Sequence, residues 1–324
     1  LAVRLAENHD LPDDALSTLI TERNEETALF LRNEARVLCE RIYGRFVYIR
    51  GLIEFTNYCK NDCYYCGIRR SNREAERYRL TEEEILSCCE AGYGLGFRTF
   101  VLQGGEDPYF TDERLGSIVA SIRGLCPDCA ITLSAGERSH DSYRRLHDAG
   151  ADRYLLRHET ADPCHYGRLH PESMSFDKRM AALKDLKEIG YQTGCGFMVG
   201  SPYQTASMIV KDLRFMKEFG PHMIGIGPFL SHKDAPFCDM ENGTAELTLY
   251  LLSVIRLMMP KVLLPATTAL GTVTEGGRGL TVWDEFARMP GKTFSGHTGD
   301  VAADHYHRYV EDVAIMKALG LKAY

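Results

Sequence analysis

The sequence predicts an α/β protein that folds as a (βα)8, TIM-type barrel. Strand-like and helix-like segments alternate along most of the 324 residues, and repeated βα units imply a parallel sheet with right-handed crossovers. Polar and glycine-rich residues come directly after the strands, which is where barrel enzymes carry their active sites. We therefore expect residues 1–45 to form a helical extension, and residues 46–324 to form the barrel with a C-terminal helical segment.

The N-terminal extension is predicted to be helical throughout. Leu11-Pro12-Asp13-Asp14 starts one helix, and apolar residues recur at helical spacing from about Thr27 to Tyr43. The pattern changes at residues 46–55, which are rich in β-branched and aromatic side chains and are expected to form the first strand.

The later βα units are marked by cap and turn signals. Thr81 and Glu84 have the spacing of a capping box, which predicts a helix to about Gly94. The eighth unit is short, because only residues 280–283 follow the glycine-rich run 276–279. The other expected strands are 98–103, 130–134, 153–157, 191–199, 223–227 and 262–266, and the other expected helices are 112–125, 140–149, 176–189, 205–219 and 245–258.

Composition excludes several classes of protein. The net charge is −7 and no basic run is long, which argues against nucleic acid as a partner. No apolar stretch reaches the roughly 18 residues that a membrane span needs. The 11 cysteines are odd in number, and most of the eight outside the Cys59–Cys66 stretch lie singly in apolar helix or strand patterns, which indicates a reducing environment rather than disulfides. We expect a cytoplasmic monomer.

Three cysteines follow the first strand closely. Cys59, Cys63 and Cys66 have the spacing C-x3-C-x2-C. A cubane iron–sulfur cluster normally takes four thiolates, so three would leave one iron open to another ligand. Structural zinc is the alternative, but zinc sites usually have four protein ligands. The next cysteines, Cys88 and Cys89, lie more than twenty residues further on.

Other polar signals follow later strands. Gly104-Gly105-Glu106 would let a ligand approach the backbone closely, although a double glycine after a strand is often just a turn. Glu159 could accept hydrogen bonds from an amine or from hydroxyls, and Arg157 could hold a carboxylate through two bonds; a surface ion pair is the alternative. Arg179 lies one turn into the next helix, where a solvated helix face is the alternative.

The cysteine spacing, with an aromatic residue before the last cysteine, resembles the signature of the radical SAM enzymes. Over residues 46–275 the chain resembles more narrowly the HydE family, the radical SAM maturases of FeFe-hydrogenase. Methylornithine synthase and biotin synthase are related families. The narrower resemblance rests on Arg157-His158-Glu159-Thr160, on Gly225-Ile226-Gly227-Pro228-Phe229 and on Pro265-Ala266-Thr267-Thr268.

The resemblance implies one 4Fe-4S cluster on the three cysteines, with S-adenosylmethionine (SAM) chelating the open iron. An electron from the cluster then cleaves SAM to a 5′-deoxyadenosyl radical. The implied SAM contacts are Gly104, Gly105, Glu106, Ser134, Glu159, Arg179 and Met198, and the implied substrate contacts are Arg157, Thr267 and Thr268.

The implied substrate is a small organometallic molecule, an iron–cysteine complex carrying CO and cyanide that a sister maturase makes. The radical reacts at its sulfur, cysteine is dismantled, and a di-iron precursor results. An electron donor is a further implied partner.

The chain departs from the family at two points. No cysteine follows Cys238, so we expect no auxiliary cluster, and the family has a longer stretch where this chain runs from Thr281 to Val282. Two alternatives stay open: a radical SAM mutase or thiol-processing enzyme that acts on an amino acid, as methylornithine synthase does, and a non-catalytic iron–sulfur protein for electron transfer.

Overall fold

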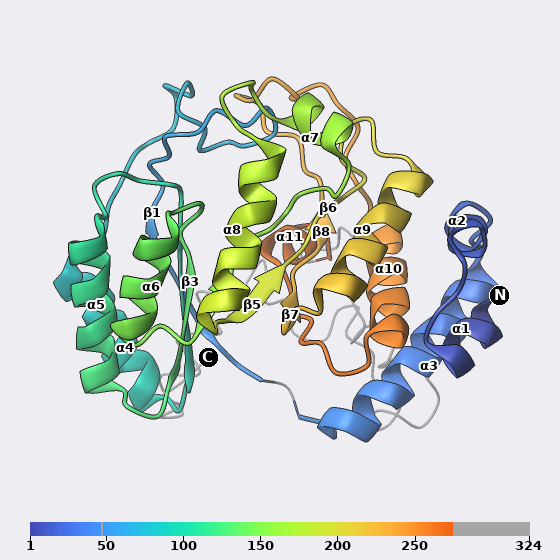
Figure 1. Ribbon diagram of the computed structural model, residues 1–324, viewed down its shortest axis with the longest axis horizontal. Helices are drawn as coiled ribbons and strands as arrows, with labels where there is room; N and C mark the ends of the chain where they lie inside the picture. Colours follow the sequence, from blue (N-terminus) through green and yellow to red (C-terminus); the bar gives the residue numbers. More distant parts are fainter. Residues whose placement is uncertain (47, 275–324) are drawn as a thin grey trace, which may run out of the picture. The chain divides into compact units, whose positions relative to one another are not determined.

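A parallel sheet dominates the first of two compact units in the chain. The computed structural model describes residues 1–46 and 48–274, and the units are Leu1–Pro265 and Ala266–Tyr324. Six strands pair in the order β1-β2-β3-β4-β5-β7, all in parallel, and β6 pairs with β8 (Figure 1). Their bounds are β1 Gly51–Thr56, β2 Thr99–Gly104, β3 Ala130–Ser134, β4 Arg153–Leu155, β5 Gln192–Cys195, β6 Met198–Val199, β7 Met223–Ile224 and β8 Gly227–Pro228.

The strand order follows the order of the chain, as the wall of a βα barrel requires. This confirms the predicted α/β class. Leu263 forms a parallel bridge with Met223 beyond β7. Closure onto β1 is not seen among residues 1–46 and 48–274, and the candidate eighth strand, 280–283, lies outside the described residues.

Helices connect the strands and pack along the sheet. The pairs α4–α5, α5–α6 and α6–α8 are in contact, and Figure 1 shows these helices side by side. Each begins at a Ser or Thr whose side chain accepts a hydrogen bond from the first turn, and Thr81 with Glu84 forms the predicted capping box. The connecting helices are α4 Glu82–Gly94, α5 Asp112–Leu125, α6 His140–Asp148, α8 Phe176–Ile189, α9 Ala206–Phe219 and α10 Ala245–Met258.

The N-terminal helices are α1 Ala2–Asn8, α2 Asp13–Thr21 and α3 Glu25–Tyr43. Helices α1 and α3 contact α10, and α2 contacts α9. Arg214 of α9 donates hydrogen bonds to Asp10 at 2.6 Å and to Asp13 at 2.6 Å. The predicted helical extension is therefore packed against α9 and α10.

Two predicted strands are interrupted at glycines. Residues 191–199 divide into β5 and β6, and residues 223–227 divide into β7 and β8. Gly196 has φ +155°, and a Cβ there would lie 2.0 Å from the carbonyl oxygen of Gly225. Because the two backbones lie too close here for a side chain, the pairing stops after Cys195 and Ile224 and resumes in the same register at Met198 and Gly227.

Two further elements differ from expectation. Helix α7, Pro163–Leu169, was not expected; it begins at Asp162, whose side chain accepts from the His165 N–H, with a proline at its start. The predicted strand at 262–266 is reduced to the single bridge at Leu263.

The described part of the second unit is α11, Thr268–Thr274. Its first turn is held by the Thr267 carbonyl, which accepts from Leu270 N and Gly271 N at 3.1 Å each. Across the described residues of both units, no helix combines the length and the apolar character that crossing a bilayer demands.

Candidate active site

The cysteine loop follows β1 and is held by one arginine. The Arg77 guanidinium donates to four backbone carbonyls, those of Asn57, Ile68, Arg69 and Asn72, at 2.5 to 3.0 Å. Asp62, inside the loop, accepts from Arg69 Nε at 2.7 Å. These charge-assisted bonds fix an irregular segment that has no helix or strand of its own.

The three thiols lie near one another in a partly buried place. Burial, together with the neighbouring Cys66 and Cys59, raises the pKa of Cys63 to about 12. Burial likewise raises the pKa of Cys66 to about 11 and raises that of Cys59. Three thiolates are therefore unfavourable here unless a cationic centre binds them, which is what a metal cluster supplies.

The three cysteine sulfurs are not all within 4.8 Å of one another. Among the described residues, the group of three ligand atoms that lie within 4.8 Å of one another is His140, Asp185 and Glu188, not the three cysteines. Sulfur ligands of one tetrahedral zinc, with bonds of about 2.3 Å, lie roughly 3.8 Å apart. The donor set thus fits a cubane cluster, whose irons separate the thiolates.

The glycine pair after β2 lets two loops touch. A Cβ on Gly105 would lie 2.2 Å from the Tyr58 carbonyl oxygen and 2.8 Å from Cys59 Cβ. The Lys60 N–H donates to the Glu106 carbonyl at 2.9 Å. The prediction that Gly104-Gly105-Glu106 lies beside the cysteines is therefore met by a close approach that only glycine permits.

Glu106 and Glu137 form a buried charged cluster with Arg179. Arg179 Nε lies 2.5 Å from Glu137 Oε1, and its NH2 group lies 3.9 Å from Glu106 Oε1. Arg179 is 7% exposed, so the alternative of a solvated helix face is wrong. Although burial opposes it, the charges of Glu137 and Glu106 raise the pKa of Arg179. Burial raises the pKa of Glu137 despite this partner.

Glu159 has a strained backbone. Its φ is +67°, in the left-handed region that few residues other than glycine adopt. Its N–H donates to the Gly196 carbonyl at 3.1 Å, and Arg157 NH2 lies 3.0 Å from its Oε2 atom. The Arg157 carbonyl accepts from Arg179 NH1 at 3.2 Å. An expected substrate residue and an expected SAM residue are therefore in contact. Glu159 is 9% exposed, which excludes a fully exposed ion pair.

His158, between Arg157 and Glu159, has a structural role. Its ring is completely buried, contacts Asp212 at 3.2 Å through Nε2 and accepts from the Gly196 N–H at 3.2 Å. Both ring nitrogens are thus occupied by the protein, and His158 holds the strained turn in place.

The remaining predicted residues divide between the two units. Ser134 ends β3 opposite Gln103, and Met198 is buried in β6 beside Leu169, Phe229 and Tyr65. Met198 therefore lies on the side of the cysteine loop. Thr267 and Thr268 belong to the second unit, so their role in substrate binding stays a prediction.

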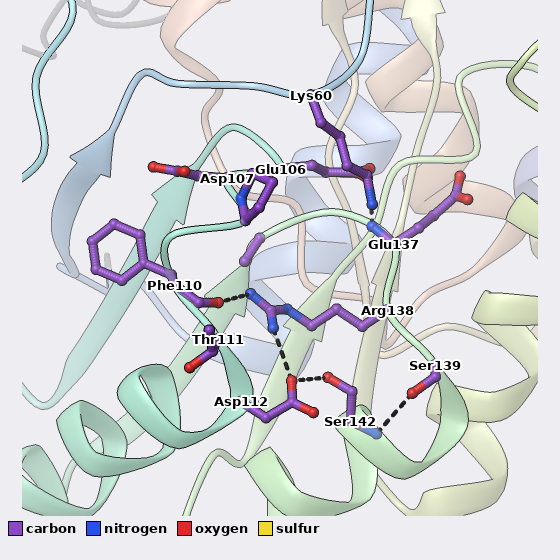
Figure 2. A pocket seen from close by; sticks show the side chains of 12 residues that line it. Lys60, Glu106, Asp107, Phe110, Thr111, Asp112, Glu137, Arg138, Ser139 and Ser142 are labelled. Atoms are coloured by element: carbon purple, nitrogen blue, oxygen red, sulfur yellow. Dashed lines mark hydrogen bonds and ion pairs between the residues drawn. The ribbon is translucent and has the colours of Figure 1, made fainter.

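A pocket of about 310 Å³ opens beside the charged cluster of Glu106, Glu137 and Arg179, between the loops that follow β2 and β3 (Figure 2). Lys60, Glu106 and Glu137 lie along one side of it, and Lys60 Nζ lies 3.2 Å from Glu106 Oε2. On the other side, Arg138 bonds to Asp112 at 3.0 Å and to the Phe110 carbonyl at 2.8 Å. The other expected SAM residues do not line this pocket, so it adjoins the site.

Several site residues escaped the sequence analysis. Glu137 follows Gly136, whose positive φ of +75° brings the backbone onto the Glu106 side chain. The sequence signal for this site was a glycine followed by the charged residues Glu137 and Arg138, shortly after a strand. His170 and Tyr166 come from α7 and its end, and no motif pointed to them.

The charged cluster fits a ligand that is a zwitterion. Buried polar atoms of five side chains have no hydrogen bond within the described part of the chain: Glu137 Oε1, Arg157 Nε, Glu159 Oε2, Tyr166 OH and Arg179 Nε. The ion pairs among them are at contact distance but are not aligned as hydrogen bonds. A ligand with an amine and a carboxylate would satisfy both kinds of charge.

Comparison with known proteins separates the chain into two parts. The profile of the Radical SAM superfamily matches residues 53–216. The FeFe hydrogenase maturase subunit HydE of Thermotoga maritima is 44% identical over 270 residues, which cover 83% of this chain and 75% of that protein. The crystal structure of methylornithine synthase (PylB) superposes with a TM-score of 0.76 at 30% identity, over 82% of this chain and 78% of that one.

The last part of the chain is similar to a different family. The profile of glycosyl hydrolase family 1 matches residues 265–324. Beta-glucosidase A of Acetivibrio thermocellus is 56% identical over 54 residues, which cover 17% of this chain and 12% of that enzyme. The match begins where the first compact unit ends, at Pro265.

Proposed function

Because the chain belongs to the radical SAM superfamily of enzymes, we propose that Cys59, Cys63 and Cys66 hold one 4Fe-4S cluster and that the enzyme acts in FeFe-hydrogenase maturation. The maturation role is supported by the 44% identity to a HydE protein over most of the chain. The observation that carries the proposal is the contact of the cysteine loop with the Gly105 loop next to the buried Arg179 cluster.

The cluster, when bound with SAM, supplies the electron that cleaves SAM to a 5′-deoxyadenosyl radical. The chain's own residues bind and orient the cofactor. Arg179 would hold the SAM carboxylate, because it is the buried guanidinium of the site. Glu159 and Glu106, each 9% exposed, would accept from the amino group. Gly104, Gly105 and Ser134 offer close backbone or hydroxyl contacts, and Met198 offers an apolar one.

Arg157 is proposed to bind the substrate. Its carbonyl already accepts from Arg179, while its guanidinium has two nitrogens without a hydrogen bond among the described residues. A guanidinium of this kind suits an anion such as the carboxylate or cyanide of an iron–cysteine complex. The radical would react at the sulfur of that complex to give a di-iron precursor, with Thr267 and Thr268 as further proposed contacts.

Partners and surroundings follow from this proposal. A sister maturase would supply the iron–cysteine complex, an electron donor would reduce the cluster, and the protein would work as a cytoplasmic monomer.

The proposal is tested by anaerobic turnover. Reconstituted protein is incubated with dithionite, SAM and the iron–cysteine complex, and 5′-deoxyadenosine and maturation of apo-hydrogenase are measured. We expect both. A protein that binds iron and sulfide but never forms 5′-deoxyadenosine would instead be an electron-transfer protein.

One observation favours a second candidate. The fold of the first unit superposes closely on methylornithine synthase, so an amino acid is the alternative substrate. If the wild-type protein rearranges lysine or a similar amino acid and does not support hydrogenase maturation, this alternative replaces the first.

A further inference from the structure

Helix α9 is bonded to the turn that contains Glu159 through one buried carboxylate. Asp212, in the middle of α9, is completely buried. Its Oδ1 atom accepts from the Ala161 N–H at 2.5 Å and lies 3.2 Å from His158 Nε2. His158 and Ala161 are the residues on either side of Glu159 and Thr160. A single oxygen atom of α9 therefore holds both ends of this four-residue turn.

His158 extends this support to the backbone of Glu159. The Gly196 N–H, which can only donate, lies 3.2 Å from His158 Nδ1, so Nδ1 accepts and Nε2 carries the proton. Nε2 therefore donates to Asp212. The Gly196 carbonyl in turn accepts from the Glu159 N–H at 3.1 Å. The Glu159 backbone is thus connected to Asp212 through Gly196 and His158 on one side and through Ala161 on the other.

The turn needs this support because of the conformation of Glu159. Its φ of +67° lies in the left-handed region, where a residue with a Cβ is strained. Such a conformation persists only where the surrounding structure holds it. The Glu159 side chain is 9% exposed, and its Oε2 atom lies 3.0 Å from Arg157 NH2. A relaxed φ would turn this carboxylate away from Arg157 and change the direction in which it accepts hydrogen bonds.

We propose that Asp212 is a positioning residue that holds the Glu159 carboxylate in the orientation that binds the amino group of SAM. The inference rests on the proposed function, because it needs Glu159 to contact SAM. Asp212 acts through the turn and not by contact with SAM, since it is completely buried and its Oδ1 atom is used by two N–H groups of the turn.

Substitutions at Asp212 separate its hydrogen bonds from its charge. Asp212→Asn keeps an oxygen at the Oδ1 position, and its amide nitrogen replaces Oδ2, which has no hydrogen bond among the described residues. Asp212→Ala removes the acceptor altogether. Asp212→Ser is a milder disrupting variant, because its side chain keeps the place polar but is one bond too short to reach both N–H groups. Leu213→Ala is the matched control, since Leu213 is the completely buried neighbour on α9.

Each variant is reconstituted anaerobically, analysed for iron and sulfide, and titrated with SAM by calorimetry, and denaturant unfolding gives its stability. We expect the affinity for SAM to fall about five- to a hundredfold in Asp212→Ala and Asp212→Ser, because SAM binding must then order a residue that no longer rests in the left-handed region. Asp212→Asn should bind SAM as wild type does. Leu213→Ala should lose stability and keep its affinity for SAM.

A second background shows whether Asp212 acts through Glu159. Glu159→Ala alone should weaken SAM binding. Adding Asp212→Ala to it should weaken binding no further, because no carboxylate is left to be positioned. A residue that merely stabilises the fold would lower the affinity equally in both backgrounds.

Four results would overturn the inference: unchanged SAM affinity in the disrupting variants, an equal loss in Asp212→Asn or Leu213→Ala, a loss that persists without the Glu159 side chain, or loss of the cluster in both Asp212→Ala and Asp212→Ser. The last would show that Asp212 only maintains the fold. If wild-type protein with an intact cluster binds no SAM, the proposed function fails as well, and the first titration reveals this before any variant is compared.

Discussion

Replacing Arg179 by alanine should weaken SAM binding about ten- to a hundred-fold. Arg179 is 7% exposed, contacts Glu137 at 2.5 Å and lies 3.9 Å from Glu106. It is therefore the buried cation to which a carboxylate entering this cluster would bind. Losing one hydrogen bond to a charged group costs roughly 1.5–3 kcal/mol, and each 1.4 kcal/mol is about a factor of ten in affinity.

The assay is anaerobic titration calorimetry with SAM on protein whose cluster content has been measured. Arg179→Lys keeps the charge but loses the planar fork, so its affinity should fall between wild type and Arg179→Ala. Lys178→Ala is the matched control, because Lys178 is the exposed neighbour on the same turn of α8. Unchanged SAM affinity in Arg179→Ala, with the cluster intact, would refute the assignment of Arg179 to SAM.

Three other predictions concern the cluster, the substrate and pH. Wild-type protein should contain near four irons per chain and a variant with Cys59, Cys63 and Cys66 all changed to alanine should contain none; near eight irons by iron and sulfide analysis would contradict the single cluster. Arg157→Ala should keep SAM affinity and uncoupled 5′-deoxyadenosine formation but lose maturation of apo-hydrogenase in a defined system; full maturation would remove Arg157 from substrate binding. Burial lowers the pKa of His170 from its ordinary 6.5 to about 4, so the unfolded chain binds a proton in that range that the folded chain does not. The apoprotein should therefore lose about 3 kcal/mol of unfolding free energy through His170 as pH falls from 6.5 to 4; denaturant unfolding should show a smaller loss in His170→Gln, and equal losses would contradict the assignment.

The sequence predicted most helices closely because their boundaries depend on local signals. The capping box at Thr81 and Glu84 fixed the start of α4, and the limits of α5, α8 and α10 agree with expectation. The strands were less predictable. Gly196 could not be recognised as a break, because its effect depends on the Gly225 backbone, which is distant in sequence.

The candidate site was predictable where the residues of one short motif themselves bind the ligand. The cysteine loop and the Gly104-Gly105-Glu106 turn meet as expected, because both follow neighbouring parallel strands. Glu137 and His170 were not found, since each acts through a tertiary contact: Glu137 pairs with Arg179 from another βα unit, and His170 meets Tyr65 across 105 positions. A single sequence contains no periodicity or spacing that reports such pairs.

The match to glycosyl hydrolase family 1 begins where the first compact unit ends, and the match to HydE runs slightly beyond that point. Arg157 lies inside the superfamily match and contacts Arg179 and Glu159, so its assignment has both sequence and geometric support. Thr267 and Thr268 come after Pro265, where the match to HydE and the match to glycosyl hydrolases overlap, so their assignment has sequence support alone. The substrate site is therefore best approached from Arg157, and the expectation that residues 266–324 complete the barrel stays a prediction.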